Sequence, residues 1–299
     1  MSPGDAAGGR LRPVDGVCVA RARTRLEAAG RAAWLHEEAA RRMAGRLQLL
    51  RRAPHRVVDW WPHAGGSGPA LAQALPAARI DAPVGVPRES PRHRWLRWLE
   101  AAASRAGRDT PAQADMVWAN MLLHHVADPL ELMTQWHRAL AIGGILMFST
   151  LGPGSLRALR DVYRDAGWGE PMAELVDMHD IGDMLVAAGF GDPVMDQEVV
   201  RLSWRTAEDA LAELRSLGAN AAPARQQGLR TPRWRHQLLA RLAQAQTCRA
   251  PDGRIALEFE IVYGHAVRPP PRLAVAPEAR IGVDDLRLAL RRPRRPGAT

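Results

Sequence analysis

This 299-residue chain contains no lysine, and all 41 of its basic residues are arginine. An arginine-only set lifts the isoelectric point to about 11.1, because the guanidinium group stays protonated far above neutral pH. Much of the net charge of +9 comes from residues 268–299, which hold eight arginines against three acids. The rest of the chain is only mildly basic. Nucleic-acid binding is therefore not favoured, and weak attraction to an acidic protein partner fits better.

Cysteine is also scarce. Cys18 and Cys248 lie far apart and belong to no Cys-x-x-Cys or Cys/His cluster, so neither a disulfide nor a metal site is indicated. No apolar run approaches the ~18–20 residues that a membrane helix needs, and the first residues lack an apolar signal core. We therefore expect a soluble, cytoplasmic protein.

Hydrophobic residues make up 46% of the chain, and their spacing alternates between strand and helix patterns. Strands are predicted at 56–59, 78–82, 115–120, 145–150, 194–204 and 254–267. Helices are predicted within 20–52 and at 69–75, 91–105, 129–144, 155–166, 180–188, 207–218, 234–246 and 283–290. This order indicates an α/β domain at 21–267, with a flexible start at 1–20 and a Pro/Arg-rich, largely disordered tail at 268–299.

Local signals assign the ends of several helices. Asp128, Ser155, Asp180 and Thr206 are predicted to cap the helices that follow them. The pair Gly143-Gly144 is predicted to close the helix that begins after Asp128, because glycine readily adopts the left-handed conformation of a helix end.

The run from Asp115 to Ser155 reads DMVWANMLLHHVADPLELMTQWHRALAIGGILMFSTLGPGS. It resembles class I S-adenosylmethionine-dependent methyltransferases, in which a strand D-x-V-x-x-N precedes a helix with E-x-x-R-x-L-x-x-G-G. Within that class, FSTLGPGSLRALRDVY, VDMHDIGDMLVAAGF, DPVMDQEVVRLSW and ALAELRSLGAN are similar to the malonyl-acyl-carrier-protein O-methyltransferases of biotin synthesis (the BioC group). The resemblance is clear over 115–220 and faint over 21–90.

The resemblance implies a Rossmann-like fold, with a mostly parallel sheet of the seven-stranded type, flanking helices and an antiparallel final strand. It also implies methyl transfer from S-adenosylmethionine to the free carboxylate of a malonyl group on acyl carrier protein, which is acidic in general. No base is needed, since a carboxylate is already nucleophilic at neutral pH. An arginine would hold the malonyl carboxylate, but 41 arginines give no basis for choosing one.

The family's first cofactor motif, [D/E]-x-G-x-G-x-G, aligns with the stretch that begins at Asp59. Trp61 and His63 stand at its first two glycine positions, and only Gly65 matches. The loop length is unchanged, because the family's proline before strand two lies 17 residues after the acid, as Pro76 does here (76 − 59 = 17).

Two further cofactor motifs are altered. The acid that binds the cofactor ribose falls on Val84, with Asp81 three residues earlier. The acid expected beside the adenine has Asp109 as its nearest counterpart, and the strand that should carry it is not evident. A sheet that is one strand short therefore remains an open alternative.

We predict that the cofactor site combines the altered loop with the end of the 115–120 strand: Asp59, Trp61, His63, Gly65, Gly66, Asn120 and Met121. His124 and His125 are predicted to line the substrate pocket. As neighbours on a strand or helix they should point apart, which argues against a metal site.

Two functions remain open. The first is an active methyltransferase of the kind described, with malonyl-loaded acyl carrier protein as substrate. The second is a catalytically degenerate homologue that binds or regulates another protein. This second function would be favoured if the side chains of Trp61 and His63 filled the cofactor pocket. Nucleic-acid methylation or binding is a third, weaker reading, with steep salt dependence as its signature.

Overall fold

The computed structural model describes residues 13–28, 30, 32–62, 64–83, 114–226, 228 and 230–271. The chain divides into two units, Met1–Pro269 and Pro270–Thr299, and all of the described helices and strands belong to the first. The α-helices are α1 Gly16–Ala28, α2 Trp34–Gly45, α3 Gly68–Ala74, α5 Pro129–Ala139, α6 Arg157–Ala166, α7 Met178–Ala187, α8 Ala207–Ser216 and α9 Pro232–Gln244. The strands are β1 Arg56–Asp59, β2 Arg79–Asp81, β3 Ala114–Ala119, β4 Leu140–Leu151, β5 Gly191–Trp204 and β6 Ile255–Val267.

The helices predicted at 91–105 and 283–290 lie outside the described residues, as do most of the predicted flexible start and of the tail. The predicted domain limits therefore stay predictions. Within the described ranges, no helix has the length and apolar character that crossing a membrane requires.

The described strands form one sheet in the order β2-β1-β3-β4-β6-β5. Neighbouring strands from β2 to β4 are parallel, and β6 runs antiparallel to both β4 and β5. The central strands carry apolar residues on both faces, in RVVD of β1 and ADMVWA of β3, as a sheet covered on both sides requires. The predicted mostly parallel sheet with an antiparallel final strand is confirmed.

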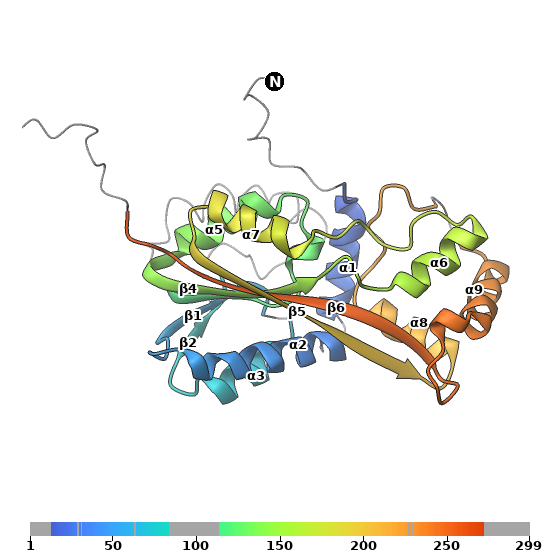
Figure 1. Cartoon of the computed structure of the whole chain (residues 1–299), viewed down its shortest axis with the longest axis horizontal. Helices are drawn as coiled ribbons and strands as arrows, with labels where there is room; N and C mark the ends of the chain where they lie inside the picture. The colour runs from blue at the N-terminus through green and yellow to red at the C-terminus, as the bar shows by residue number, and fades with distance from the viewer. Residues whose placement is uncertain are drawn as a thin grey trace, which may run out of the picture. The chain divides into compact units, whose positions relative to one another are not determined.

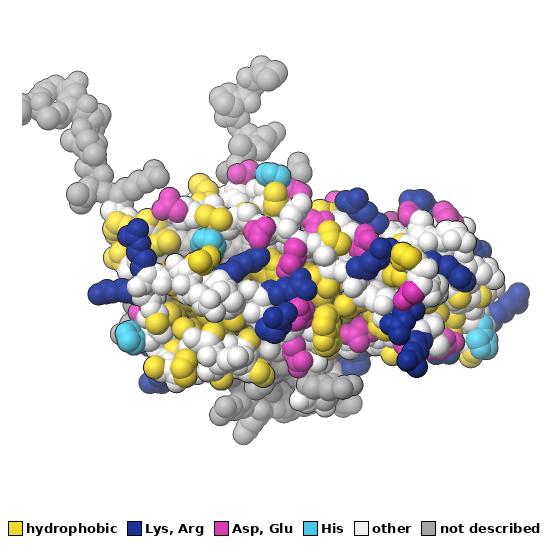
Figure 2. All heavy atoms as spheres, turned by 60° about the horizontal axis from the view of Figure 1, so that its bottom comes forward, with side chains coloured by type: hydrophobic (Ala, Val, Ile, Leu, Met, Phe, Trp, Pro, Cys, Tyr) yellow, Lys and Arg dark blue, Asp and Glu magenta, His cyan; other side chains and the backbone are white. Residues whose placement is uncertain are grey.

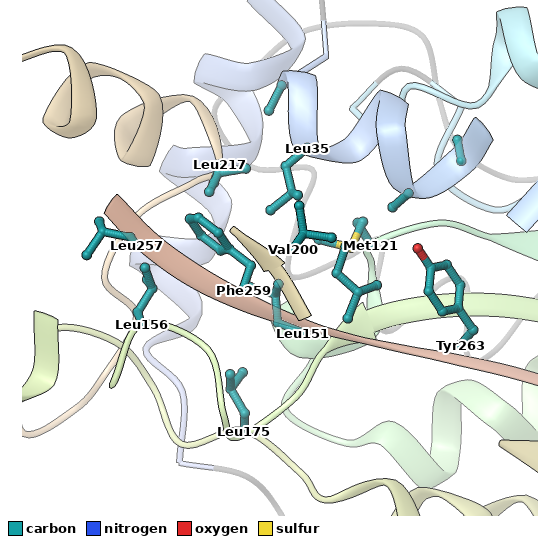
Figure 3. Packing of buried hydrophobic residues seen from close by; sticks show 14 of the residues in the cluster. Leu35, Met121, Leu151, Leu156, Leu175, Val200, Leu217, Leu257, Phe259 and Tyr263 are labelled. Carbon is teal, nitrogen blue, oxygen red and sulfur yellow. The ribbon is translucent and has the colours of Figure 1, made fainter. Parts of the chain in front are cut away.

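Helices cover both faces of the sheet (Figure 1). α2 and α3 lie on one face and α5 and α7 on the other, while α6, α8 and α9 gather beyond the carboxyl ends of β4 and β5. Because side chains alternate along a strand, β3 sends Met116 and Trp118 into the core under α2 and Val117 into the core under α5. Figure 3 shows the first of these cores, where Leu35 of α2 lies close to Met121.

Two predicted caps are present. The Asp128 carboxylate accepts a hydrogen bond from the Glu131 N–H at 2.9 Å at the start of α5. The Thr206 hydroxyl accepts one from the Asp209 N–H at 3.1 Å at the start of α8.

The predicted end of the 129–144 helix is wrong. α5 ends at Ala139, and Gly143 and Gly144 lie inside β4. The chain that follows β6 pairs with both glycines: the Gly143 N–H donates to the Arg268 carbonyl at 2.8 Å, and the Arg268 N–H donates to the Gly144 carbonyl at 2.9 Å. This pairing is long-range, so the local glycine signal gave no hint of it.

Two predicted caps are wrong. The Ser155 hydroxyl donates to the Glu260 carbonyl at 3.0 Å and accepts from the Glu260 N–H at 3.1 Å, so it ties the loop before α6 to β6. α7 is capped by Asp177, which accepts from the His179 N–H at 2.8 Å, and not by Asp180. Residue type marks a possible cap, but it neither chooses between neighbouring acids nor reveals a partner far along the chain.

Candidate functional site

The carboxyl ends of β1, β3 and β4 lie at one edge of the sheet, because these strands are parallel. Loops leave this edge after Asp59, Ala119 and Leu151. Ligands of open α/β sheets bind beyond such carboxyl ends. We call this region the carboxyl edge.

The loop after β1 is a tight turn that needs glycine at two positions. The Gly65 N–H donates to the Trp61 carbonyl at 3.0 Å. A Cβ atom on Gly65 would lie 2.6 Å from that carbonyl oxygen and 3.2 Å from the carbonyl oxygen of Asn120. Gly66 has a φ of +68°, a conformation that side chains rarely adopt. The backbone can therefore pack closely here although a tryptophan occupies an earlier glycine position of the motif.

The two tryptophans of this loop have different surroundings. Trp60 packs against Trp136 of α5, with ring centroids 6.5 Å apart, and belongs to the core on that face. Trp61 is 4% exposed and contacts His36 of α2 and His125, with ring centroids 6.2 and 5.1 Å away. Of the two, Trp61 is the one that belongs to the carboxyl edge.

Nε1 of Trp61 and Nε2 of His36, which lie at the carboxyl edge, are buried without a hydrogen-bond partner among the described residues. Burial lowers the pKa of His36, which favours the neutral ring. Its Nδ1 lies 2.7 Å from the Ala64 carbonyl and so carries the proton, which leaves Nε2 as an acceptor. These two atoms are one donor and one acceptor.

Asp59 places a buried carboxyl group at the carboxyl end of β1. It is 1% exposed, and its Oδ1 accepts a hydrogen bond from the Trp61 N–H at 3.1 Å. Burial raises the pKa of Asp59 to about 7, although that N–H acts in the opposite direction. A cation beside this carboxyl would favour its ionised form, so the position suits a positively charged ligand.

Asn120 connects three parts of the carboxyl edge. Its amide nitrogen donates to the His36 carbonyl at 2.8 Å and also to the Gly65 carbonyl. Its Oδ1 accepts from the Ser149 hydroxyl of β4 at 2.6 Å. The side chain of the next residue, Met121, is fully buried in the core under α2. Asn120 and Met121 therefore frame the carboxyl edge. The Asn120 side chain is occupied by hydrogen bonds within the protein, and the Met121 side chain by packing in the core.

The predicted substrate-pocket histidines lie in a 3-10 turn, Leu123–His125. Nδ1 of His124 lies 3.2 Å from the Thr150 hydroxyl oxygen, while the His125 ring meets Trp61 edge-on. Their ring centroids are 4.1 Å apart, so the prediction that they point apart is wrong. Strand and helix geometry separates neighbouring side chains, but this single turn follows neither. The part of the chain that the structure describes contains no group of three residues suited to a metal ion.

Asp81, from the second family motif, is engaged in β2. It accepts hydrogen bonds from Arg79 Nε at 2.9 Å and Arg56 Nε at 3.0 Å, and these arginines, Arg79 foremost, lower its pKa. His63, Val84 and Asp109 lie outside the described residues.

Arg25 of α1 reaches the carboxyl edge, although the sequence did not single it out. Its guanidinium donates to the carbonyls of Gly218 and Arg215, the latter at 3.2 Å. Gly218 lies against His125, because a Cβ atom on this glycine would be 3.2 Å from the imidazole Cε1. No carboxylate of the described residues pairs with Arg25. Its contact with Gly218, 193 residues further along the chain, brings Arg25 to this region, and no local sequence pattern predicts that contact.

Comparison with known proteins places this geometry in a family. Residues 14–191 match a family model described as "Methyltransferase domain". The malonyl-[acyl-carrier protein] O-methyltransferase of Gallionella capsiferriformans (strain ES-2) is 35% identical over 253 residues, which cover 80% of this chain and 86% of that protein. The protein of the same name from Laribacter hongkongensis (strain HLHK9) is 35% identical, and the match covers 81% of this chain and 85% of that protein. The one from Halorhodospira halophila (strain DSM 244 / SL1) is 33% identical, and the match covers 89% of this chain and 90% of that protein.

The family-model match shows that residues 14–191 form a methyltransferase domain, with the sheet and carboxyl edge described above. Within that class, the chain belongs to the malonyl-[acyl-carrier protein] O-methyltransferase family, and the predicted resemblance is confirmed.

Proposed function

We propose that this protein transfers a methyl group from S-adenosylmethionine to the free carboxylate of a malonyl group carried on acyl carrier protein. The observation that carries the proposal is similarity over most of the chain to relatives named for that reaction. The alternative of a non-catalytic homologue is not favoured, because the relatives that match 80% or more of this chain are named as methyltransferases.

The described residues fit a cationic, hydrogen-bonding cofactor. The buried Asp59 carboxyl suits positive charge. The unpartnered Trp61 Nε1 and His36 Nε2 supply a donor and an acceptor for polar groups of the cofactor. We assign these three residues, with Gly65 and Gly66, to the cofactor site, framed by Asn120 and Met121. When bound, S-adenosylmethionine supplies a methyl group activated by a sulfonium.

The reaction needs alignment and a dry site more than acid or base chemistry. A malonyl carboxylate oxygen forms the new O–CH₃ bond as the bond from that methyl carbon to sulfur breaks, and no proton moves. The buried ring of Trp61 excludes water at the carboxyl edge, and the His125 ring packs against it. None of these groups has to accept a proton, because a carboxylate is already nucleophilic at neutral pH.

We propose that Arg25 holds the malonyl carboxylate. A guanidinium group has five N–H donors, and the two carbonyls that Arg25 contacts leave others free for a carboxylate. His124 and His125 would line the pocket between Arg25 and the cofactor, since Gly218 links Arg25 to the His125 ring. With one carboxylate oxygen bound to Arg25, the other oxygen of the same carboxylate would be oriented toward the methyl group.

Two experiments test the proposal separately. Titration calorimetry with S-adenosylhomocysteine should give saturable binding, and no binding at millimolar ligand would overturn the cofactor assignment and favour the regulatory homologue. Expression in a biotin-requiring strain that lacks this methylation step should restore growth. Cofactor binding without restored growth would overturn the proposed methyl acceptor and leave the cofactor assignment intact.

A further inference from the structure

One long segment of this chain has no acidic residue. Residues 214–251 contain seven arginines and neither aspartate nor glutamate, whereas the whole chain has 32 acids among 299 residues. The segment includes α9 and the loops that flank it. The domain as a whole is only mildly basic, so its net charge does not account for a segment of this length without acids.

α9 presents its charge on an exposed face. Its buried face is made of leucine: Leu238, Leu239 and Leu242. Arg233, His236 and Arg241 are exposed, and helical spacing places them on one side of the helix. No carboxylate of the described residues forms an ion pair with either arginine. We call this exposed side the α9 face.

An aromatic cluster orders two of the arginines. The rings of Trp168 and Trp234 lie 5.4 Å apart. The guanidinium carbon of Arg230 lies 4.1 Å from the centre of the Trp234 ring, and that of Arg241 lies 5.5 Å from the centre of the Trp168 ring. A guanidinium group held against an aromatic ring has fewer side-chain rotamers to lose when it binds a carboxylate. These side chains are therefore prepared for acidic partners.

The α9 face lies at the same end of the strands as the candidate site, beyond their carboxyl ends. α6 and α8 follow the carboxyl ends of β4 and β5, and α9 packs against α6 through Trp234 and Tyr163, whose ring centroids are 6.3 Å apart. The loop from α8 to α9 contains Gly218, which contacts His125 at the carboxyl edge. Basic side chains are prominent at this end of the molecule in Figure 2.

We propose that the α9 face is the docking surface for the acidic carrier protein that presents the malonyl group. This inference rests on the proposed function, because a carrier protein is a partner only if its malonyl thioester is the substrate. Charge complementarity selects the occupant: arginines without carboxylate partners among the described residues match a carboxylate-rich protein surface. A carrier docked there would hold its thioester-linked group beside the loop that leads to His125.

The test reverses two charges on the α9 face and two elsewhere. Arg233→Glu/Arg241→Glu should lower kcat/KM for malonyl-carrier protein at least roughly fivefold, through KM, with a weakened salt dependence. Turnover of malonyl-coenzyme A, a malonyl thioester without the carrier protein, should be unchanged. Arg51→Glu/Arg52→Glu is the matched control, because both residues are exposed and precede the amino end of β1. Immobilised malonyl-carrier protein gives the affinities directly, independent of turnover.

The outcomes are distinguishable. Equal affinity of both double variants and the unaltered protein for malonyl-carrier protein would overturn the docking surface but leave the proposed function intact. Failure of the unaltered protein to bind or methylate malonyl-carrier protein would overturn the function itself. Loss of affinity for a fluorescent DNA or RNA duplex in the α9 variant, with carrier binding unchanged, would assign the face to nucleic acid instead. Matching circular dichroism and melting temperatures confirm that the variants fold.

Discussion

The carboxyl edge and the α9 face both concentrate polar groups, but they are built in opposite ways. At the edge the groups are buried and mutually bonded: Asp59 is 1% exposed, and Asn120 is fully buried with three side-chain hydrogen bonds. On the α9 face Arg233 and Arg241 are exposed and pair with no carboxylate of the described residues. Changes at the edge should therefore alter stability and cofactor binding together. Changes on α9 should alter partner binding alone.

The largest effect is expected from Trp61→Gly, which restores glycine at a position where the family has it. Removing a buried tryptophan side chain leaves a cavity, so the free energy of unfolding should fall by about 3–5 kcal/mol. Urea unfolding measures this loss, and titration with S-adenosylhomocysteine should show weaker binding because Nε1 is lost as a donor. Trp61→Phe, which keeps most of the ring, is the control. Tighter binding by the glycine variant would mean that Trp61 fills the cofactor pocket of the native protein.

The next effect depends on pH and concerns Asp59. Its pKa rises on folding to about 7 from 3.8, so the folded state binds the proton more tightly than the unfolded state does. The stability from this group is complete below about pH 4 and is lost as pH rises through 7, by up to about 4 kcal/mol. Asp59→Asn should lack this fall, which urea unfolding at pH 5 and pH 8 would reveal. Identical pH dependence in both proteins would show that Asp59 does not titrate in this range.

Asn120→Ala should lower the free energy of unfolding by about 3 kcal/mol, because it leaves buried groups of His36, Gly65 and Ser149 without their partner. Ser149→Ala is the comparison: it removes one of these bonds to Asn120 and the bond that the Ser149 hydroxyl accepts from the Met121 N–H at 3.1 Å, and it should cost about 2 kcal/mol. Thermal and urea unfolding give both values. Equal costs for the two variants would contradict the view that Asn120 braces α2, the loop and β4.

The sequence predicted the sheet much better than it predicted the contacts of the site. β1 begins and ends at the predicted residues, and the strand at 115–120 is displaced by one residue, because short apolar runs between turn residues are local signals. Gly143-Gly144 misled the prediction of α5 because the residue that pairs with both, Arg268, lies more than a hundred positions later. Asp59 could be found by its motif position, but its raised pKa arises from burial that appears only in the fold.

Arg25 illustrates the same limit for the acceptor site. Its sequence neighbourhood is an ordinary arginine-rich helix, and its relevance comes from contacts with Arg215 and Gly218, about 190 residues away. Likewise, the absence of acids over 214–251 can be read from the sequence, but the placing of that segment beside the carboxyl edge cannot. Residue type and spacing predict elements and motifs, while the grouping of distant side chains requires the packed fold.

The smallest expected effect concerns Arg25, which shares features of both regions: it is exposed like the α9 arginines, yet it is tied to the carboxyl edge through backbone carbonyls. Arg25→Gln removes the charge that we propose binds the malonyl carboxylate. KM should rise roughly tenfold, the loss expected for one charge-assisted hydrogen bond. Unlike the α9 variant, it should do so equally for malonyl-carrier protein and malonyl-coenzyme A, while S-adenosylhomocysteine affinity stays the same. Arg25→Lys keeps the charge and should recover part of the loss. An increase in KM for malonyl-carrier protein alone would show that Arg25 contacts the carrier protein and not the malonyl carboxylate. The docking surface would then extend to Gly218, where the carboxyl edge begins.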